Sequence, residues 1–189
     1  METLPQFLAP ALAQARDRAI GERVAGDSWS FLSTAQLRRR VDSIACALRA
    51  NEIGAGDRVA LIAQNCVDWV VADLGIVFAG CVCVPIFSTG ALDQMQYILA
   101  DCGAKLAFVE RTADAARLRA AISQAPPIVA FDDPGPDGLA AFERAGAALL
   151  AADPQAPERL RAPIRPGDLA VLIYTSGTTG DPKGVMLTH

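Results

Sequence analysis

The residues best suited to chemistry are concentrated in residues 174–184, which read YTSGTTGDPKG. This segment holds four Ser and Thr hydroxyls, three glycines and one lysine. Glycine tolerates a positive φ and lets backbone N–H groups approach an anion, and hydroxyls can donate to phosphate oxygens or bind magnesium. Lysine adds a mobile positive charge on a long stem. The segment therefore predicts a loop that binds a phosphorylated ligand.

The lysine of this segment is rare in the chain. Lys and Arg together number 17, and only Lys105 and Lys183 are lysines. A solvated loop without a ligand is the alternative, and it explains neither the lysine nor the hydroxyls around it. The segment is not a Walker A loop, because Gly184 follows Lys183 where that motif needs Ser or Thr. Residues 185–188 look extended, so N–H groups and hydroxyls, rather than a helix dipole, would hold the anion.

Alternating strand and helix patterns lead up to this loop. Continuous apolar runs predict buried strands at 57–63, 82–86, 105–109, 128–131 and 169–174. Helical patterns lie between them at 66–79, 92–102, 112–124 and 139–152. The repeated β-α order predicts an α/β fold, a three-layer αβα arrangement with a mostly parallel sheet. Ligands bind at the carboxyl ends of the strands in such sheets, which is where residues 174–184 begin.

The first third of the chain predicts a small hairpin and an amphipathic helix. Residues 24–31 place a Gly-Asp turn between two apolar pieces, and 33–36 form a capping box. The helix that follows has an apolar face, made of Val41, Ile44, Ala45 and Leu48. Three arginines on it, Arg38, Arg39 and Arg40, fan around the axis and predict a solvated flank.

Two other stretches need an interpretation. Residues 74–92 carry no charge, but glycines and a proline interrupt them, so we expect a buried helix and a buried strand instead of a transmembrane span. Residues 153–167 (DPQAPERLRAPIRPG) predict a proline-rich linker without a regular element. The N-terminus begins with Glu2, has no basic region and does not resemble a signal peptide.

Composition excludes several classes of protein. The chain has 189 residues, 52% of them hydrophobic, which argues for a folded core, and a net charge of −4, which argues against nucleic acid as a partner. The single histidine, His189, excludes a catalytic triad or a histidine-rich metal site within these residues. Five widely spaced cysteines predict buried reduced thiols in a cytoplasmic protein: Cys46, Cys66, Cys81, Cys83 and Cys102.

The sequence YTSGTTGDPKGVMLTH closely resembles the phosphate-binding signature of the adenylate-forming superfamily, the AMP-dependent synthetases and ligases. Residues 56–110 resemble the amino-terminal region of the same enzymes, and their details are most similar to bacterial long-chain fatty-acid–CoA ligases. Residues 111–165 match only generically. One departure is Phe87-Ser88-Thr89, where relatives more often have Tyr-Pro-Thr. The resemblance implies that residues 1–189 are the N-terminal part of an AMP-binding domain that contains the linker 153–167.

The resemblance also implies a reaction and a set of site residues. Such enzymes activate a carboxylate, here a fatty acid, with ATP and Mg²⁺, and then transfer the acyl group to the thiol of CoA. By match to the motif, the residues that cradle the phosphates are Thr175, Ser176, Gly177, Thr178, Thr179, Gly180 and Lys183. Thr175 would also bind the metal ion. No catalytic residue is assigned within the chain.

The same resemblance raises the question of what the chain does alone. Family members are a few times longer, so residues 1–189 are expected to be inactive by themselves. The alternative is a non-catalytic module that binds nucleotide or a partner chain. A sheet built for a larger enzyme should expose apolar surface, which predicts self-association. Peripheral contact with a membrane surface stays open.

Overall fold

A mostly parallel sheet of six strands runs through the described part of the chain, residues 2–175 and 181–189 of the computed structural model. Its order is β6-β5-β3-β4-β7-β8, and only β8, at the edge, is antiparallel to its neighbour. The strands are β3 (Arg58–Ile62), β4 (Val82–Pro85), β5 (Leu106–Val109), β6 (Ile128–Ala130), β7 (Leu169–Thr175) and β8 (Lys183–Thr188). The predicted sheet is confirmed.

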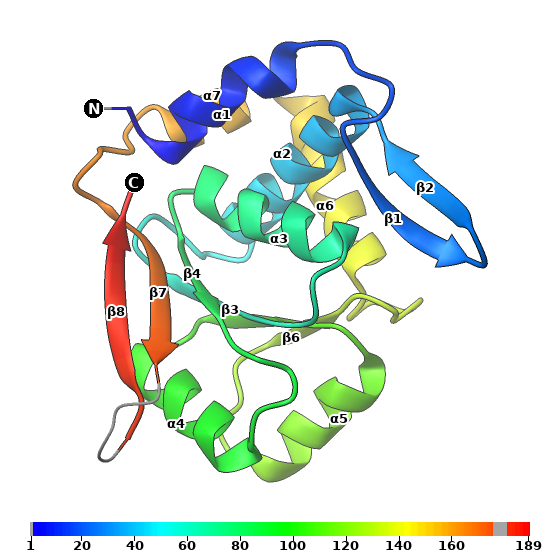
Figure 1. The fold of residues 1–189 in the computed structure, drawn as a ribbon. Helices are drawn as coiled ribbons and strands as arrows, with labels where there is room; N and C mark the ends of the chain where they lie inside the picture. The colour runs from blue at the N-terminus through cyan, green and yellow to red at the C-terminus, as the bar shows by residue number, and fades with distance from the viewer. Residues whose placement is uncertain (1, 176–180) are drawn as a thin grey trace.

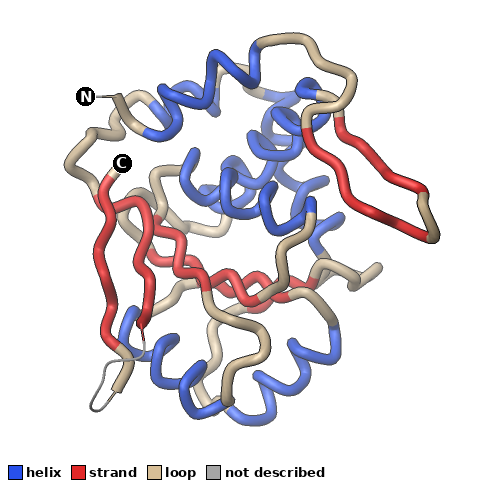
Figure 2. Tube along the Cα trace, in the orientation of Figure 1, coloured by secondary structure: helices blue, strands red, loops and turns tan. Residues whose placement is uncertain are grey.

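Helices cover both faces of this sheet, as Figure 1 and Figure 2 show. One layer contains α1 (Leu4–Ala13), α2 (Thr34–Ala50), α3 (Val67–Phe78), α6 (Leu139–Ala152) and α7 (Ala156–Arg161). The other contains α4 (Leu92–Cys102) and α5 (Thr112–Ala121). Crossovers between parallel strands are right-handed, so connections that run in opposite directions along the sheet place their helices on opposite faces. In the sheet, β4 lies on one side of β3, whereas β5 and β6 lie on the other side. The connection through α3 therefore runs in the opposite direction to those through α4 and α5, and α3 covers the opposite face.

Strand β3 shows how the two cores are divided. Val59 and Leu61 lie in the core beneath α2 and α3, whereas Ala60 and Ile62 lie in the core beneath α4 and α5. Alternate residues of a strand point to opposite faces, so a strand covered on both sides must be apolar throughout. The continuous apolar run predicted this placement, and it is confirmed.

Helix α2 begins and packs as its sequence predicts. Ser33 caps the helix: its hydroxyl accepts from the N–H of Gln36, and the Gln36 side chain accepts from the N–H of Ser33. The four residues of the predicted apolar face are all at most 1% exposed. The arginine flank is only partly solvated, because Arg40 forms ion pairs with Asp68 of α3 and Glu143 of α6.

Two further predictions of local structure are confirmed. Strands β1 (Ile20–Ala25) and β2 (Ser28–Leu32) form a separate antiparallel hairpin, which projects to the right in Figure 1. The uncharged stretch 74–92 contains the end of α3, strand β4 and the start of α4. No helix in the described ranges is long and apolar enough to cross a bilayer.

Two predictions are wrong. The stretch 153–167 does contain a regular element, because α7 spans Ala156–Arg161. Pro157 lies in its first turn, where a helix needs no N–H donor and the fixed φ of proline is favourable. Strand β7 is not buried throughout: only Ala170 is fully buried, and Ile173 is 36% exposed. Apolar sequence alone does not show whether a helix covers a strand near the edge of a sheet.

The thiols follow the prediction with one exception. Cys46, Cys81, Cys83 and Cys102 are buried and free, whereas Cys66 is half-buried. The Cys66 sulfur lies at the start of α3 and accepts a hydrogen bond from the N–H of Trp69 at 3.3 Å. Cys66 therefore has a local structural role as a helix cap.

Candidate functional site

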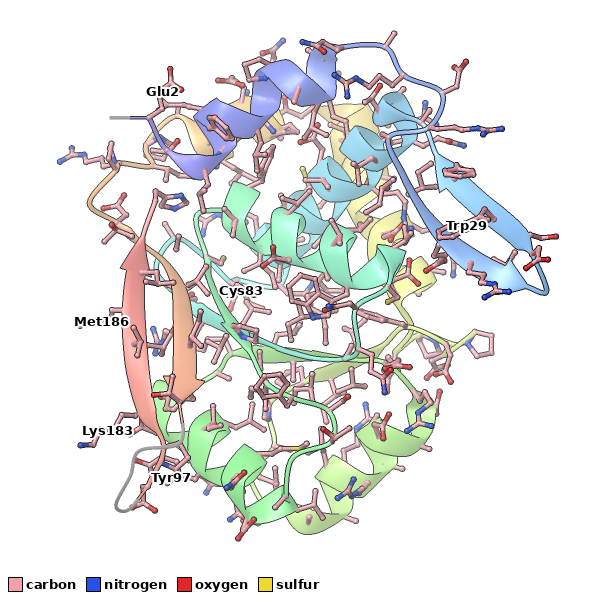
Figure 3. The ribbon with its side chains drawn as sticks, in the orientation of Figure 1. Glu2, Trp29, Cys83, Tyr97, Lys183 and Met186 are labelled. Atoms are coloured by element: carbon pink, nitrogen blue, oxygen red, sulfur yellow. The ribbon has the colours of Figure 1, made fainter. Side chains whose placement is uncertain are left out.

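The β7–β8 hairpin brings together the two ends of the predicted phosphate loop. Thr175, the last residue of β7, is paired in register with Lys183, the first residue of β8. Five of the predicted binding residues, 176–180, lie outside the described residues. Thr175 and Lys183 are both exposed, and Lys183 points away from the helices in Figure 3. Of the predicted site, the structure thus places one hydroxyl and one ammonium side by side.

The hairpin lies where an open α/β sheet binds ligands. β7 runs parallel to β4, with Val171 opposite Cys83, so Thr175 is at the carboxyl edge of the sheet. The expectation from the sequence that residues 185–188 are extended is confirmed, since β8 continues to Thr188. The anion would therefore lie near a strand-to-strand connection, and strands carry little net dipole, which leaves side chains and N–H groups as donors.

A small pocket of about 150 Å³ opens beside the hairpin. Its walls come from the end of β4 and the following loop, from α4, and from the two ends of the predicted phosphate loop. The lining residues are Pro85, Ile86, Phe87, Gly90, Gln94, Met95, Ile98, Tyr174 and Pro182. The Phe87 side chain is 83% exposed at this pocket. The pocket is mostly apolar, which suits part of an organic ligand better than a phosphate.

A hydrogen bond joins the hairpin to helix α4. The Tyr174 hydroxyl donates to Oδ2 of Asp101 at 2.5 Å. Burial, together with this hydrogen bond to a carboxylate, raises the pKa of Tyr174. Tyr97, one turn earlier on α4, also has a raised pKa, caused first by desolvation and then by the charges of Asp101 and Asp181. Residues on both sides of the predicted loop therefore lie next to α4.

The link between Tyr174 and Asp101 was not among the residues predicted from the sequence. One signal could have pointed to it: Asp101 is in the last turn of α4, where the helix dipole disfavours a negative charge. An acidic residue in such a place needs a donor from elsewhere in the fold. The sequence does not say that the donor is 73 positions away.

The metal prediction rests on Thr175 alone. Within the described residues, no group of three or more His, Cys, Asp or Glu side chains is arranged to hold a metal ion. A single hydroxyl is a weak ligand, and Mg²⁺ is commonly bound by one or two protein groups together with the phosphate oxygens of a substrate. The exposed Thr175 hydroxyl fits such a shared site and does not form a metal centre by itself.

The comparison with known families assigns the chain. The family described as AMP-binding enzyme matches residues 11–189, so the chain belongs to this family. The long-chain-fatty-acid–CoA ligase FadD15 of Mycobacterium bovis is 32% identical over 176 residues, which make up 92% of this chain and 29% of that ligase. The crystal structure of the N-terminal domain of FACL13 from Mycobacterium tuberculosis matches with a TM-score of 0.74 and 28% identity, covering 100% of this chain and 44% of that one.

Other relatives show how widely the family extends. The Mycobacterium tuberculosis fatty acyl CoA synthetase has a TM-score of 0.64 and 32% identity, over 84% of this chain and 29% of that structure. Tyrocidine synthase 2 of Brevibacillus parabrevis is 32% identical over 158 residues, 84% of this chain and 4% of that protein. The chain corresponds to the N-terminal part of the fatty-acid–CoA ligases. It spans 29% of the length of the Mycobacterium bovis ligase. The predicted superfamily and fold are confirmed.

Proposed function

We propose that the chain is the N-terminal part of an AMP-forming long-chain fatty-acid–CoA ligase and that its β7–β8 hairpin holds the phosphates of ATP. The observation that carries the proposal is the Thr175–Lys183 pair at the carboxyl edge of the sheet. It lies within the residues that match the AMP-binding family. The fatty acid, ATP and CoA are the substrates of the complete ligase.

The residues of this chain have a limited part in that reaction. The carboxylate of the fatty acid attacks the α-phosphorus of ATP, forms an acyl-adenylate and releases pyrophosphate; the CoA thiol then displaces AMP. Lys183 neutralises charge that accumulates on the leaving pyrophosphate, as a preorganised cation does in phosphoryl chemistry. Thr175 would offer its hydroxyl oxygen to a Mg²⁺ ion, which would neutralise charge on the phosphates. The match to the motif assigns the remaining donors to residues 176–180, which lie outside the described residues.

The exchange of radioactive pyrophosphate into ATP tests the proposal. The complete ligase that carries this chain is expected to catalyse the exchange when a long-chain fatty acid is present. Residues 1–189 alone are expected to give none, because the part matched here is only 29% of the length of the Mycobacterium bovis ligase FadD15. Measurable exchange by residues 1–189 alone would overturn this division of labour. If the chain binds a triphosphate, and a longer protein that contains it also catalyses no exchange, the alternative of a non-catalytic nucleotide-binding module is favoured.

The cytoplasm is the proposed location. All five thiols are free, and four of them are buried in the two cores. Structural thiols that stay reduced are typical of a reducing compartment. The proposal predicts that labelling under denaturing conditions, without reductant, followed by peptide mapping, finds all five cysteines of residues 1–189 reactive in protein isolated from its source.

Exposed apolar side chains of the hairpin support a second proposal, that residues 1–189 self-associate. Apolar side chains of β7 and β8 are 36–73% exposed, namely Ile173, Val185, Met186 and Leu187. β8 is also an edge strand, and unpaired edges with apolar residues favour association.

Light scattering on Met186→Lys tests the self-association. Met186 is 73% exposed, and a charge on an edge strand opposes pairing without emptying the core. The variant is expected to have a lower average mass than the wild type at the same concentration. The control is Phe7→Lys, which places the same charge at a 68% exposed position on α1 and should leave the mass unchanged. Co-sedimentation of the wild type with uncharged liposomes, lost in Met186→Lys, would instead assign this surface to a membrane.

A further inference from the structure

The hydrogen bond between Tyr174 and Asp101 lies at the entrance to the proposed phosphate site. Tyr174 immediately precedes Thr175, and its hydroxyl donates to a carboxylate in the last turn of α4 at 2.5 Å. The acceptor is charged, and hydrogen bonds to charged groups are roughly twice as strong as those between neutral groups. Tyr174 is half-buried, so the bond is partly shielded from water.

Gly184 makes room for the tyrosine ring. Tyr174 and Gly184 are opposite each other in the β7–β8 register and therefore lie on the same face of the hairpin. A Cβ at Gly184 would lie 2.9 Å from Cδ1 of Leu172 and 3.4 Å from Cζ of Tyr174. The ring and the Leu172 side chain thus occupy the space that a side chain at position 184 would need. Both pack against the core beneath α4 and α5.

The neighbouring register pair faces the other way. Successive residues of a strand point to opposite faces, so Thr175 and Lys183 lie on the face away from Tyr174 and Gly184. Fixing Tyr174 to α4 consequently fixes the direction in which Thr175 and Lys183 point. A second contact region supports this arrangement: Asp181, which precedes β8, lies close enough to Tyr97 of α4 to raise its pKa.

We propose that Asp101 and Tyr174 are positioning residues of the phosphate site: their hydrogen bond holds the hairpin on α4 and orients Thr175 and Lys183 toward a triphosphate. The proposal rests on the proposed function of the hairpin. Neither residue needs to contact the ligand. Asp101 acts through Tyr174, and Tyr174 acts through the strand that also carries Thr175. The hydrogen bond preorganises the end of the β7–β8 hairpin, so less conformational entropy is lost when the hairpin binds the ligand.

Three variants separate this role from others. Tyr174→Phe removes the hydroxyl and keeps the ring over Gly184; Asp101→Ala removes the acceptor; Asp101→Asn keeps an acceptor oxygen without the charge. Binding of MgATP to residues 1–189, measured by calorimetry, is expected to weaken about 3- to 10-fold in the first two and less in Asp101→Asn, because binding must then order a hairpin that the bond no longer holds, and this costs only part of what a hydrogen bond to a charged group contributes. The melting temperature should change little, since the pair lies at the surface.

The matched control is Asp137→Asn. Asp137 is also an exposed aspartate in a charged contact, with Arg119 at 2.8 Å, but it follows β6 at the opposite edge of the sheet. Its substitution should leave MgATP binding unchanged. Wild-type affinity in Tyr174→Phe would overturn the proposal. A loss of affinity in proportion to a loss of melting temperature, in all variants including the control, would also overturn it by showing general destabilisation.

Hydrogen exchange keeps this proposal separate from the proposed function. Amides of residues 171–175 and 183–188 are expected to exchange at least about threefold faster in Tyr174→Phe and Asp101→Ala than in the wild type, whereas β3 and β5 are unaffected. Unchanged exchange in the hairpin would refute the role of the pair. Complete absence of MgATP binding to the wild type, with faster hairpin exchange in the variants, would refute phosphate binding by this chain and leave the attachment of the hairpin to α4 established.

Discussion

Gly146 of α6 lies directly against the backbone of Ser43 in α2. A Cβ built on Gly146 would be 1.8 Å from the Ser43 carbonyl oxygen and 3.1 Å from the Cβ of Ala47. The two helices therefore meet at a point where no side chain fits. The contact belongs to the helical layer that supports one face of the sheet, so it bears on the stability of the whole fold (Figure 1).

Gly146→Ala should lower the free energy of unfolding by about 1–3 kcal/mol, because overpacking forces the two backbones apart. Helix propensity alone predicts the opposite, a gain of about 1 kcal/mol. Urea unfolding decides between them. Ala145→Gly, at the exposed neighbouring position, is the control for propensity and should cost about 1 kcal/mol. A Gly146→Ala protein more stable than the wild type would contradict the close contact.

Arg40 joins three helices of the same layer. Its guanidinium lies 2.8 Å from Asp68 of α3 and 2.5 Å from Glu143 of α6. All three side chains are at most 36% exposed, so the ion pairs are less screened than surface pairs. Arg40→Met should lower the free energy of unfolding by about 1–2 kcal/mol, since two carboxylates lose a charged donor. Chemical denaturation measures the loss.

The adjacent arginine provides the control for Arg40. Arg39 is exposed on the same helix, and Arg39→Met removes the same charge from solvent. It should change the free energy of unfolding by less than about 0.5 kcal/mol. Equal effects of the two substitutions would show that the ion pairs of Arg40 add nothing beyond the charge of the helix.

Asp73 gives the stability of the chain a defined dependence on pH. Burial raises the pKa of Asp73, and a hydrogen bond with Cys83 opposes the shift only in part. Because the folded-state pKa is above the unfolded value of about 4, this group stabilises the fold fully below about pH 4. The contribution is lost as the pH rises through the raised pKa.

Asp73→Asn should therefore gain stability relative to the wild type as the pH is raised from about 4 to about 7. The quantity to compare is the difference in the free energy of unfolding between variant and wild type at each pH, from urea titrations. Asp17→Asn, at an exposed position, controls for the change in net charge. A difference for Asp73→Asn that is constant with pH would mean that the carboxylate is solvated in the folded state.

The sequence predicts structure that is determined by residues close together in the chain. Strands β3 and β5, and helix α4, were predicted within one or two residues at each end, because burial on both faces and helical periodicity are written into neighbouring residues. The sequence does not predict helix α7, because the four prolines of residues 153–167 favour an irregular linker, although Pro157, the one proline inside the helix, lies in its first turn.

Contacts between distant residues could not be predicted in this way. The run Arg38 to Arg40 looked solvated, since the sequence does not show that Asp68 and Glu143 meet Arg40. Likewise the motif named Thr175 and Lys183, while the bond that joins Tyr174 to Asp101 depends on how β7 packs beside α4. The motif predicts the chemistry of the proposed site, and only the fold shows that the hairpin is bonded to α4.

Lys183→Ala should weaken MgATP binding about tenfold or more, because a charge-assisted contact to phosphate is worth about 1.5–3 kcal/mol. The loss should shrink at high salt, where the contribution of an exposed charge is screened. In the complete ligase the same substitution should slow adenylation. Lys105→Ala is the matched control, since Lys105 is the other lysine and is exposed ahead of β5, away from the hairpin. If both substitutions leave adenylation unchanged, Lys183 does not bind phosphate; if both weaken it equally, net charge and not position is responsible.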